Sequence, residues 1–112
     1  MQRLCGVAVV ILIGAMFAGA AGAQDSGLVG LHDKVRVGNK ICMADHFHTG
    51  TSSGRNSRKE AEAAAMSDWA GFTAWEYGNA WGQPGMAESK GMSCANSGGW
   101  GCTFEARPCR RR

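Results

Sequence analysis

Residues 57–77, SRKEAEAAAMSDWAGFTAWEY, are the longest stretch of this 112-residue chain with a clear helical pattern. Ser57 and Glu60 form an S-x-x-E capping box, in which the hydroxyl and the carboxylate satisfy free backbone N–H groups at the start of a helix. The alanines that follow have the highest helix propensity of any residue, and Gly78 supplies a natural C-terminal stop. The sequence therefore predicts a helix over residues 57–77, and the core must be built against it.

The predicted helix carries a broad apolar face. When its residues are placed at about 100° each around Trp69, the neighbouring positions are apolar or small. They are Ala65, Met66, Phe72 and Thr73, with Trp75 and Tyr77 at the margins. This face is too wide for one neighbouring element, so we expect the helix to be covered from two sides or to expose a tryptophan.

Glu76 interrupts this apolar face. A carboxylate that is buried without a partner costs several kcal/mol. We therefore expect a cationic partner for Glu76, with Lys90 and Arg107 as the candidates.

Shorter segments on both sides of the helix predict strands. Within residues 34–43, polar and apolar side chains alternate over Val35 and Val37, and a Gly38-Asn39 turn follows. This pattern indicates a strand or hairpin. Residues 90–94 and 100–106 flank a turn cluster, which indicates a C-terminal hairpin. Residues 45–57 have no apolar period and predict a loop. The fold class is α+β: a central helix on a small antiparallel sheet made of the C-terminal hairpin, to which residues 34–43 can add a strand.

The start of the chain resembles a secretory leader. A basic start, an apolar run over residues 4–18 and small residues ending at Ala23 predict a signal peptide over residues 1–23, cleaved before Gln24. The apolar run is shorter than the roughly 20 residues of a membrane span, so no transmembrane span is expected after cleavage. Residues 24–33 are expected to form a flexible arm and residues 34–112 a single domain, exported to the periplasm or out of the cell.

Four cysteines remain after the leader with Cys5 is removed. An even count in a short exported chain indicates disulfides, and no Cys-x-x-Cys pair suggests a zinc site. Of the three possible pairings we favour Cys94–Cys102, across the predicted hairpin, and Cys42–Cys109, between the N-terminal strand and the tail.

The charge of the chain gives little indication of a partner. The formal charge of +3 includes Arg3, so it falls to +2 without the leader, which is too little to indicate nucleic-acid binding. Residues 110–112 are arginines, which could bind anionic lipids or polymers of the cell envelope. A solvated tail is the simpler interpretation.

Asp45, His46 and His48 form the densest set of metal-ligand side chains. Two imidazoles and a carboxylate can bind Zn²⁺ or Cu²⁺. In a loop the two histidines could converge on one ion. The alternative is that one imidazole packs into the fold while the other is solvated.

Two further patterns suggest other functions. Residues 50–54 match G-x-S-x-G, but that motif needs an α/β-hydrolase sheet, for which this chain is too short, so no enzyme is predicted. Trp69, Trp75 and Trp81 would lie about 120° apart on a continuous helix. One core face cannot take all three, which makes Trp75 and Trp81 candidates for an exposed binding surface.

Three motifs carry a family resemblance: Cys42-x-x-Asp-His-Phe-His48, Glu76-Tyr-Gly78 and Ala106-Arg-Pro-Cys109. The chain resembles small exported bacterial hypothetical proteins with no known activity. The resemblance implies a single exported domain with paired cysteines and no particular site. The favoured function is a non-catalytic structural or binding protein of the envelope or periplasm, and the alternative is a metal-binding protein.

Overall fold

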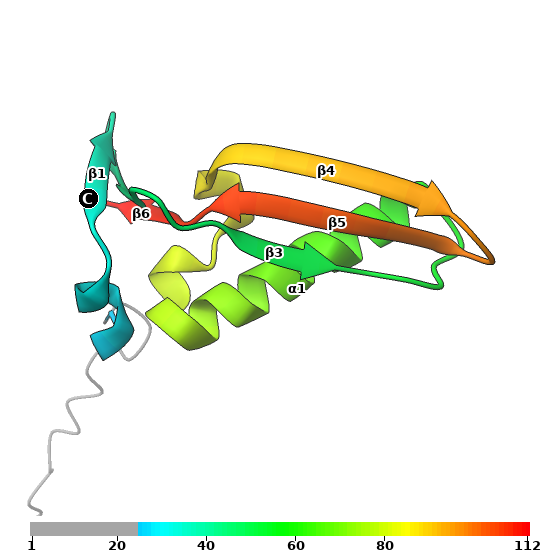
Figure 1. Ribbon diagram of the computed structural model, residues 1–112, viewed down its shortest axis with the longest axis horizontal. Helices are drawn as coiled ribbons and strands as arrows, with labels where there is room; N and C mark the ends of the chain where they lie inside the picture. Colours follow the sequence, from blue (N-terminus) through cyan, green and yellow to red (C-terminus); the bar gives the residue numbers. More distant parts are fainter. Residues whose placement is uncertain (1–24) are drawn as a thin grey trace, which may run out of the picture.

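The computed structural model describes residues 25–112 (Figure 1). The predicted signal peptide and its cleavage point between Ala23 and Gln24 lie outside the described residues. Within the described part, none of the helices is long and apolar enough to cross a membrane. Over residues 25–112 the chain forms one α-helix, two small antiparallel sheets and three short 3₁₀ helices, which confirms the α+β class.

Helix α1 spans Arg58–Tyr77 and confirms the predicted central helix. Ser57 is its N-cap, and the Ser57 side chain accepts a hydrogen bond from the Glu60 N–H at 3.1 Å. The helix ends at Gly78, which has a positive φ of 110° that glycine adopts without a Cβ clash. The 3₁₀ helix η2 (Asn79–Trp81) follows at once.

The larger sheet has the strand order β3-β5-β4 and lies along α1 (Figure 1). Strands β4 (Glu88–Asn96) and β5 (Trp100–Arg107) form the predicted C-terminal hairpin. The 3₁₀ helix η3 (Pro84–Met86) leads into β4. The hairpin side chains that are buried in the apolar cluster with α1 come from alternate positions of β5, namely Cys102, Phe104 and Ala106. Met92 and Cys94 of β4 pack against this cluster.

Strand β3 (His48–Thr51) corrects the prediction of a loop over residues 45–57. It pairs with β5 and alternates buried and exposed side chains, but its inward residues are histidine and glycine, so no apolar period marked it. A Cβ at Gly50 would lie 2.2 Å from the Ala65 carbonyl oxygen and 2.4 Å from the Trp69 nitrogen. Only glycine allows β3 to approach α1 this closely.

The smaller sheet has the order β1-β2-β6. Strands β1 (Lys34–Val37) and β2 (Lys40–Met43) form a hairpin, as residues 34–43 predicted, with Gly38 in the turn at a φ of 59°. These strands do not join the β3-β5-β4 sheet. They pair instead with β6 (Cys109–Arg111), because Pro108 has no N–H to continue the β5 ladder and the chain leaves the first sheet there.

The helix buries a narrower stripe than predicted. Every fourth residue from Ala61 to Tyr77 is buried, whereas Phe72 is 45% exposed and Trp75 is 78% exposed. Trp69 lies at the centre: its ring contacts Phe104 edge-on at 5.7 Å and its Nε1–H donates to the Ala106 carbonyl at 3.3 Å. Trp75 therefore fulfils the expectation of an exposed tryptophan on the helix.

Residues 25–33, expected to form a loose arm, pack against the C-terminal end of α1. The 3₁₀ helix η1 (Gly27–Leu31) buries Val29 in a second apolar cluster with Met43, Tyr77 and Trp81. The Ser26 N–H donates to the Tyr77 carbonyl at 3.0 Å. One valine in a Gly-rich segment is too weak a pattern to reveal this contact from sequence.

One disulfide joins two strands within each sheet. Cys42–Cys109 links β2 to β6, and Cys94–Cys102 links β4 to β5, with S–S distances of 2.04 and 2.02 Å. This is the pairing favoured from the sequence. The tail arginines of residues 110–112 follow the first disulfide directly.

Candidate functional site

All three histidines of the sequence lie together at the C-terminal end of α1. His32 follows η1, His46 lies in the connection from β2 to β3, and His48 begins β3. The ring centroids of His32 and His46 are 4.5 Å apart, and those of His46 and His48 are 4.9 Å apart. Three segments that are separate in the sequence therefore bring every imidazole of the chain to one place.

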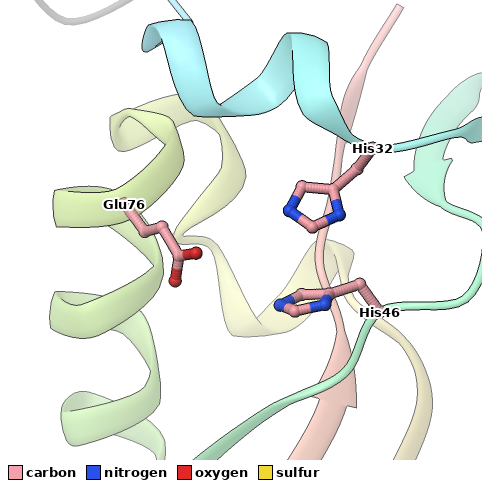
Figure 2. A group of neighbouring side chains, drawn as sticks. All are labelled: His32, His46 and Glu76. Atoms are coloured by element: carbon pink, nitrogen blue, oxygen red, sulfur yellow. The ribbon is translucent and has the colours of Figure 1, made fainter.

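Glu76, in the last turn of α1, faces these imidazoles. Figure 2 shows its carboxylate directed toward the rings of His32 and His46. One ligand atom from each of these three residues lies within 4.8 Å of the other two, and all three side chains are half-buried. We call His32, His46 and Glu76 the three-ligand group.

The three-ligand group has the chemistry of a transition-metal site. Zn²⁺ binds imidazole nitrogen and carboxylate oxygen at about 2.0–2.2 Å, so ligand atoms around a tetrahedral ion are about 3.3 Å apart. The atoms of this group, all within 4.8 Å of one another, need to approach by at most about 1.5 Å to reach that spacing. Because two of them come from connections between elements, small backbone and side-chain movements achieve it.

His48 is more deeply placed than the other two histidines. It is 3% exposed, and its Nδ1 lies 2.8 Å from the Thr73 Oγ1. Burial, reinforced by the charges of His46 and His32, lowers the pKa of His48 to about 4. The ring is therefore neutral near pH 7, with one protonated nitrogen and one nitrogen that carries a free lone pair.

Tyr77 forms an aromatic wall of the site. Its ring stacks on His48 at 4.9 Å with an angle of 15° between the planes, and it meets His32 edge-on at 5.5 Å. Burial, together with the charge of Glu76, raises the pKa of Tyr77 to about 12. The phenol thus stays neutral and fixes the imidazoles by packing.

The predicted partners of Glu76 are wrong. Its Oε2 lies 3.2 Å from the His48 Nε2. Lys90 instead donates to the Gly85 carbonyl at 3.5 Å, and the Arg107 guanidinium lies over the Phe47 ring at 5.2 Å. The reason is that the last turn of α1 faces the segments that carry the histidines, whereas the side chains of Lys90 and Arg107 make their contacts elsewhere.

The predicted metal ligands are partly brought together. His46 belongs to the three-ligand group and His48 adjoins it. Asp45 is exposed and lines a shallow pocket beside His32 and His46, outside the group. The sequence does not predict His32 as a ligand, because nothing in its Gly-rich surroundings distinguishes it. Glu76 was recognised as anomalous but not as a ligand.

The other predicted site residues lie away from this cluster. Trp75 is exposed on the outer face of α1, where its ring lies 6.3 Å from that of Phe72. Trp81 was wrongly predicted on the surface: it is fully buried, and its Nε1–H donates to the Asp25 carboxylate at 2.7 Å. The helix ends at Gly78, and η2 turns the Trp81 indole beneath the N-terminal segment.

The serine of the G-x-S-x-G pattern has a structural role. The Ser52 hydroxyl donates to the Ala61 carbonyl at 2.6 Å and accepts from the Cys102 N–H at 3.1 Å. These bonds fix the end of β3 to the helix and to β5.

Comparison with protein-family models, with curated proteins and with solved structures finds no match for this chain. Its function is therefore inferred from the chemistry of its own residues.

Proposed function

We propose that this chain is a small exported binding protein whose ligand is a divalent transition-metal ion, Zn²⁺ or Cu²⁺, held by His32, His46 and Glu76. The observation that carries the proposal is the convergence of these three side chains from three separate segments. Two imidazoles and a carboxylate favour Zn²⁺ and Cu²⁺. Ca²⁺ and Mg²⁺ prefer sites made of oxygen ligands alone.

Packing alone, without a bound ion, does not explain why Glu76 lies among the histidines. Glu76 is half-buried, yet none of the lysines or arginines in the described chain pairs with it. Its neighbours are imidazoles, one of which is held neutral by burial. A carboxylate in these surroundings lacks a full positive charge, and a metal ion would supply it.

The two disulfides support the exported part of the proposal. Disulfides persist in oxidising compartments such as the periplasm and the cell exterior, and this chain has one in each sheet. In this proposal the protein acts by binding in the periplasm, at the envelope or outside the cell, and has no catalytic role.

A metal titration tests the proposal. The purified chain is stripped with a chelator and titrated with Zn²⁺ by calorimetry, and with Co²⁺ by visible absorption, which reports coordination geometry. We expect one ion per chain. His32→Ala, His46→Ala and Glu76→Gln should each weaken Zn²⁺ binding by more than about 100-fold, because even loss of a group that orients a ligand costs about 10–100-fold.

The matched control is Glu105→Gln, which neutralises an exposed carboxylate of β5 on the face of the sheet opposite to the buried His48. It should bind Zn²⁺ like the parent chain. Absence of Zn²⁺ and Co²⁺ binding in the parent, or equal affinity in the parent and the three ligand variants, would overturn the proposal.

A further inference from the structure

We infer that His48 is the fourth protein ligand of this ion, bound through Nε2, and that Thr73 holds its ring in the metal-binding tautomer. The inference rests on the proposed function and deepens it. It changes the site from two imidazoles and a carboxylate to three imidazoles and a carboxylate, which completes the tetrahedral set that Zn²⁺ prefers.

The position of the His48 Nε2 is the first reason. This atom is buried and makes no hydrogen bond within the described residues. It lies 3.2 Å from the Glu76 Oε2, but the ring is not oriented to donate to that oxygen. Two ligand atoms of a tetrahedral zinc ion are about 3.3 Å apart. The pair is thus already spaced as two ligands of one ion.

The bond at the other ring nitrogen is the second reason. The His48 Nδ1 lies 2.8 Å from the Thr73 Oγ1, and both side chains are buried. When Nδ1–H donates to this hydroxyl, the lone pair of the neutral ring is on Nε2, beside the Glu76 carboxylate. A histidine that binds a metal through one nitrogen usually donates its other N–H to a neighbouring oxygen acceptor. The Thr73 hydroxyl can in turn donate to the helix carbonyl four residues earlier.

The rigidity of His48 is the third reason. Its backbone is paired with Ala106 of β5, and its ring stacks on Tyr77 and contacts Phe72 at 4.8 Å. Glu76 is fixed on α1. These two residues therefore form a preorganised half of the site. His32 and His46, which lie in connections (Figure 2), supply the half that closes on the ion.

Nitrogen NMR of the imidazoles tests the inference directly. The full chain is labelled with ¹⁵N-histidine, stripped of metal and given one equivalent of Zn²⁺. Because the chain has three histidines, each ring nitrogen can be assigned. We expect the Nε2 of His48 to shift to the position of a coordinated nitrogen while its Nδ1 keeps a proton.

The outcomes separate this inference from the proposed function. If Zn²⁺ moves none of the rings, both are overturned. If His32 and His46 respond while His48 keeps a proton on Nε2, the metal site stands and the fourth ligand is wrong. Coordination of His48 through Nδ1 would also overturn the assigned arrangement.

A pair of Thr73 variants tests the positioning role. Thr73→Val keeps the shape but removes the acceptor, and should weaken Zn²⁺ binding by about 10–100-fold and broaden or shift the His48 Nδ1–H signal. Thr73→Ser keeps a hydroxyl and should restore both. Circular dichroism confirms that each variant is folded. Equal affinity in the valine variant and the parent would overturn the role of Thr73.

Discussion

The two ends of α1 bury the same stripe of residues against very different neighbours. At Ala61, Ala65 and Trp69 the neighbours are apolar side chains of β5 and the bare backbone of Gly50. At Thr73 and Tyr77 the stripe continues, but the neighbours include imidazoles, beside the second apolar cluster of Val29, Met43 and Trp81. Figure 1 shows the larger sheet along the first part of the helix and the N-terminal segment beside its last turns.

This difference separates residues that stabilise the fold from residues that are candidates for function. A helix end designed for stability alone would continue the apolar stripe, because buried polar groups contribute less than well-packed apolar ones. The C-terminal end of α1, which we call the histidine end, instead holds a buried imidazole, a half-buried carboxylate and a tyrosine hydroxyl without a hydrogen bond among the described residues. Real proteins break the packing rules at functional sites more often than elsewhere.

The largest effect on stability is expected at the N-terminal part of α1, the packed end, where the buried stripe meets apolar neighbours. Trp69→Ala removes the centre of the apolar cluster and the Nε1–H bond to Ala106, and should lower the free energy of unfolding by about 3–5 kcal/mol. Trp75→Ala, on the exposed face of the same helix, should change it by less than about 0.5 kcal/mol. Urea denaturation measures both. Similar losses for the two variants would contradict the assignment of the buried stripe.

The two disulfides offer the next comparison. Cys42–Cys109 closes a loop with a sequence separation of 67, and Cys94–Cys102 one with a separation of 8. The loss of chain entropy in the unfolded state alone predicts a stabilisation of about 4.4 kcal/mol for the longer loop and about 2.5 kcal/mol for the shorter one. Replacing each pair with alanine should therefore destabilise the chain more at Cys42–Cys109, as measured by urea denaturation.

The same variants distinguish the two ends of the helix. Strand β2 leads into the segment of His46, so loss of Cys42–Cys109 should also weaken Zn²⁺ binding. Loss of Cys94–Cys102 should leave Zn²⁺ affinity close to that of the parent. A larger loss of stability or of affinity in the Cys94–Cys102 variant would contradict the comparison.

Metal addition should stabilise the histidine end selectively. At a free Zn²⁺ concentration of 100 times its Kd, linkage predicts a gain of about 2.7 kcal/mol, which a chelator should reverse and His46→Ala should abolish. Hydrogen exchange locates the gain. The amide of Ser26, which donates to Tyr77, should be more protected with Zn²⁺. Uniform protection along α1, or none near Ser26, would argue against a local site.

The elements that could be predicted from the sequence are those with local signals. The capping box at Ser57, the alanine-rich start of α1 and the turn glycines at 98 and 99 each act within a few residues. Helix α1 and the C-terminal hairpin therefore follow from the sequence alone. The disulfide pairing followed in part, because a hairpin places Cys94 opposite Cys102.

The elements that escaped prediction depend on contacts between distant segments. Strand β3 is identified by a glycine that packs on Ala65 and Trp69 of the helix, 15 or more positions along the chain. Strand β6 exists only because β2 is available to pair with it. His32 reaches the site because Val29 anchors its segment beside Tyr77. For the same reason the candidate site could be predicted only in part, from the proximity of His46 and His48 in the sequence.

The smallest effect is expected at the ion pair that links the two sheets. Lys40 of β2 donates a side-chain hydrogen bond to Glu88 of β4, and a second to the Met86 carbonyl at 3.0 Å. The hydrogen bond and charge of Lys40 hold the pKa of Glu88 below its usual 4.5. Because the folded-state pKa is the lower one, the pair stabilises the fold above pH 4.5, and this contribution is lost as pH falls through the folded-state pKa.

Lys40→Met should therefore flatten the fall in stability below pH 4.5 while changing the stability at neutral pH only slightly, because exposed ion pairs contribute little. Glu62→Gln, which breaks the Arg58–Glu62 pair on the solvent side of α1, is the matched control and should leave the link between the sheets intact. Thermal unfolding between pH 3 and 7 measures both. Lys40→Met should leave Zn²⁺ affinity unchanged. If it weakened Zn²⁺ binding as much as a ligand variant does, the Lys40–Glu88 pair would belong to the metal site, and the separation of α1 into a packed end and a histidine end would be wrong.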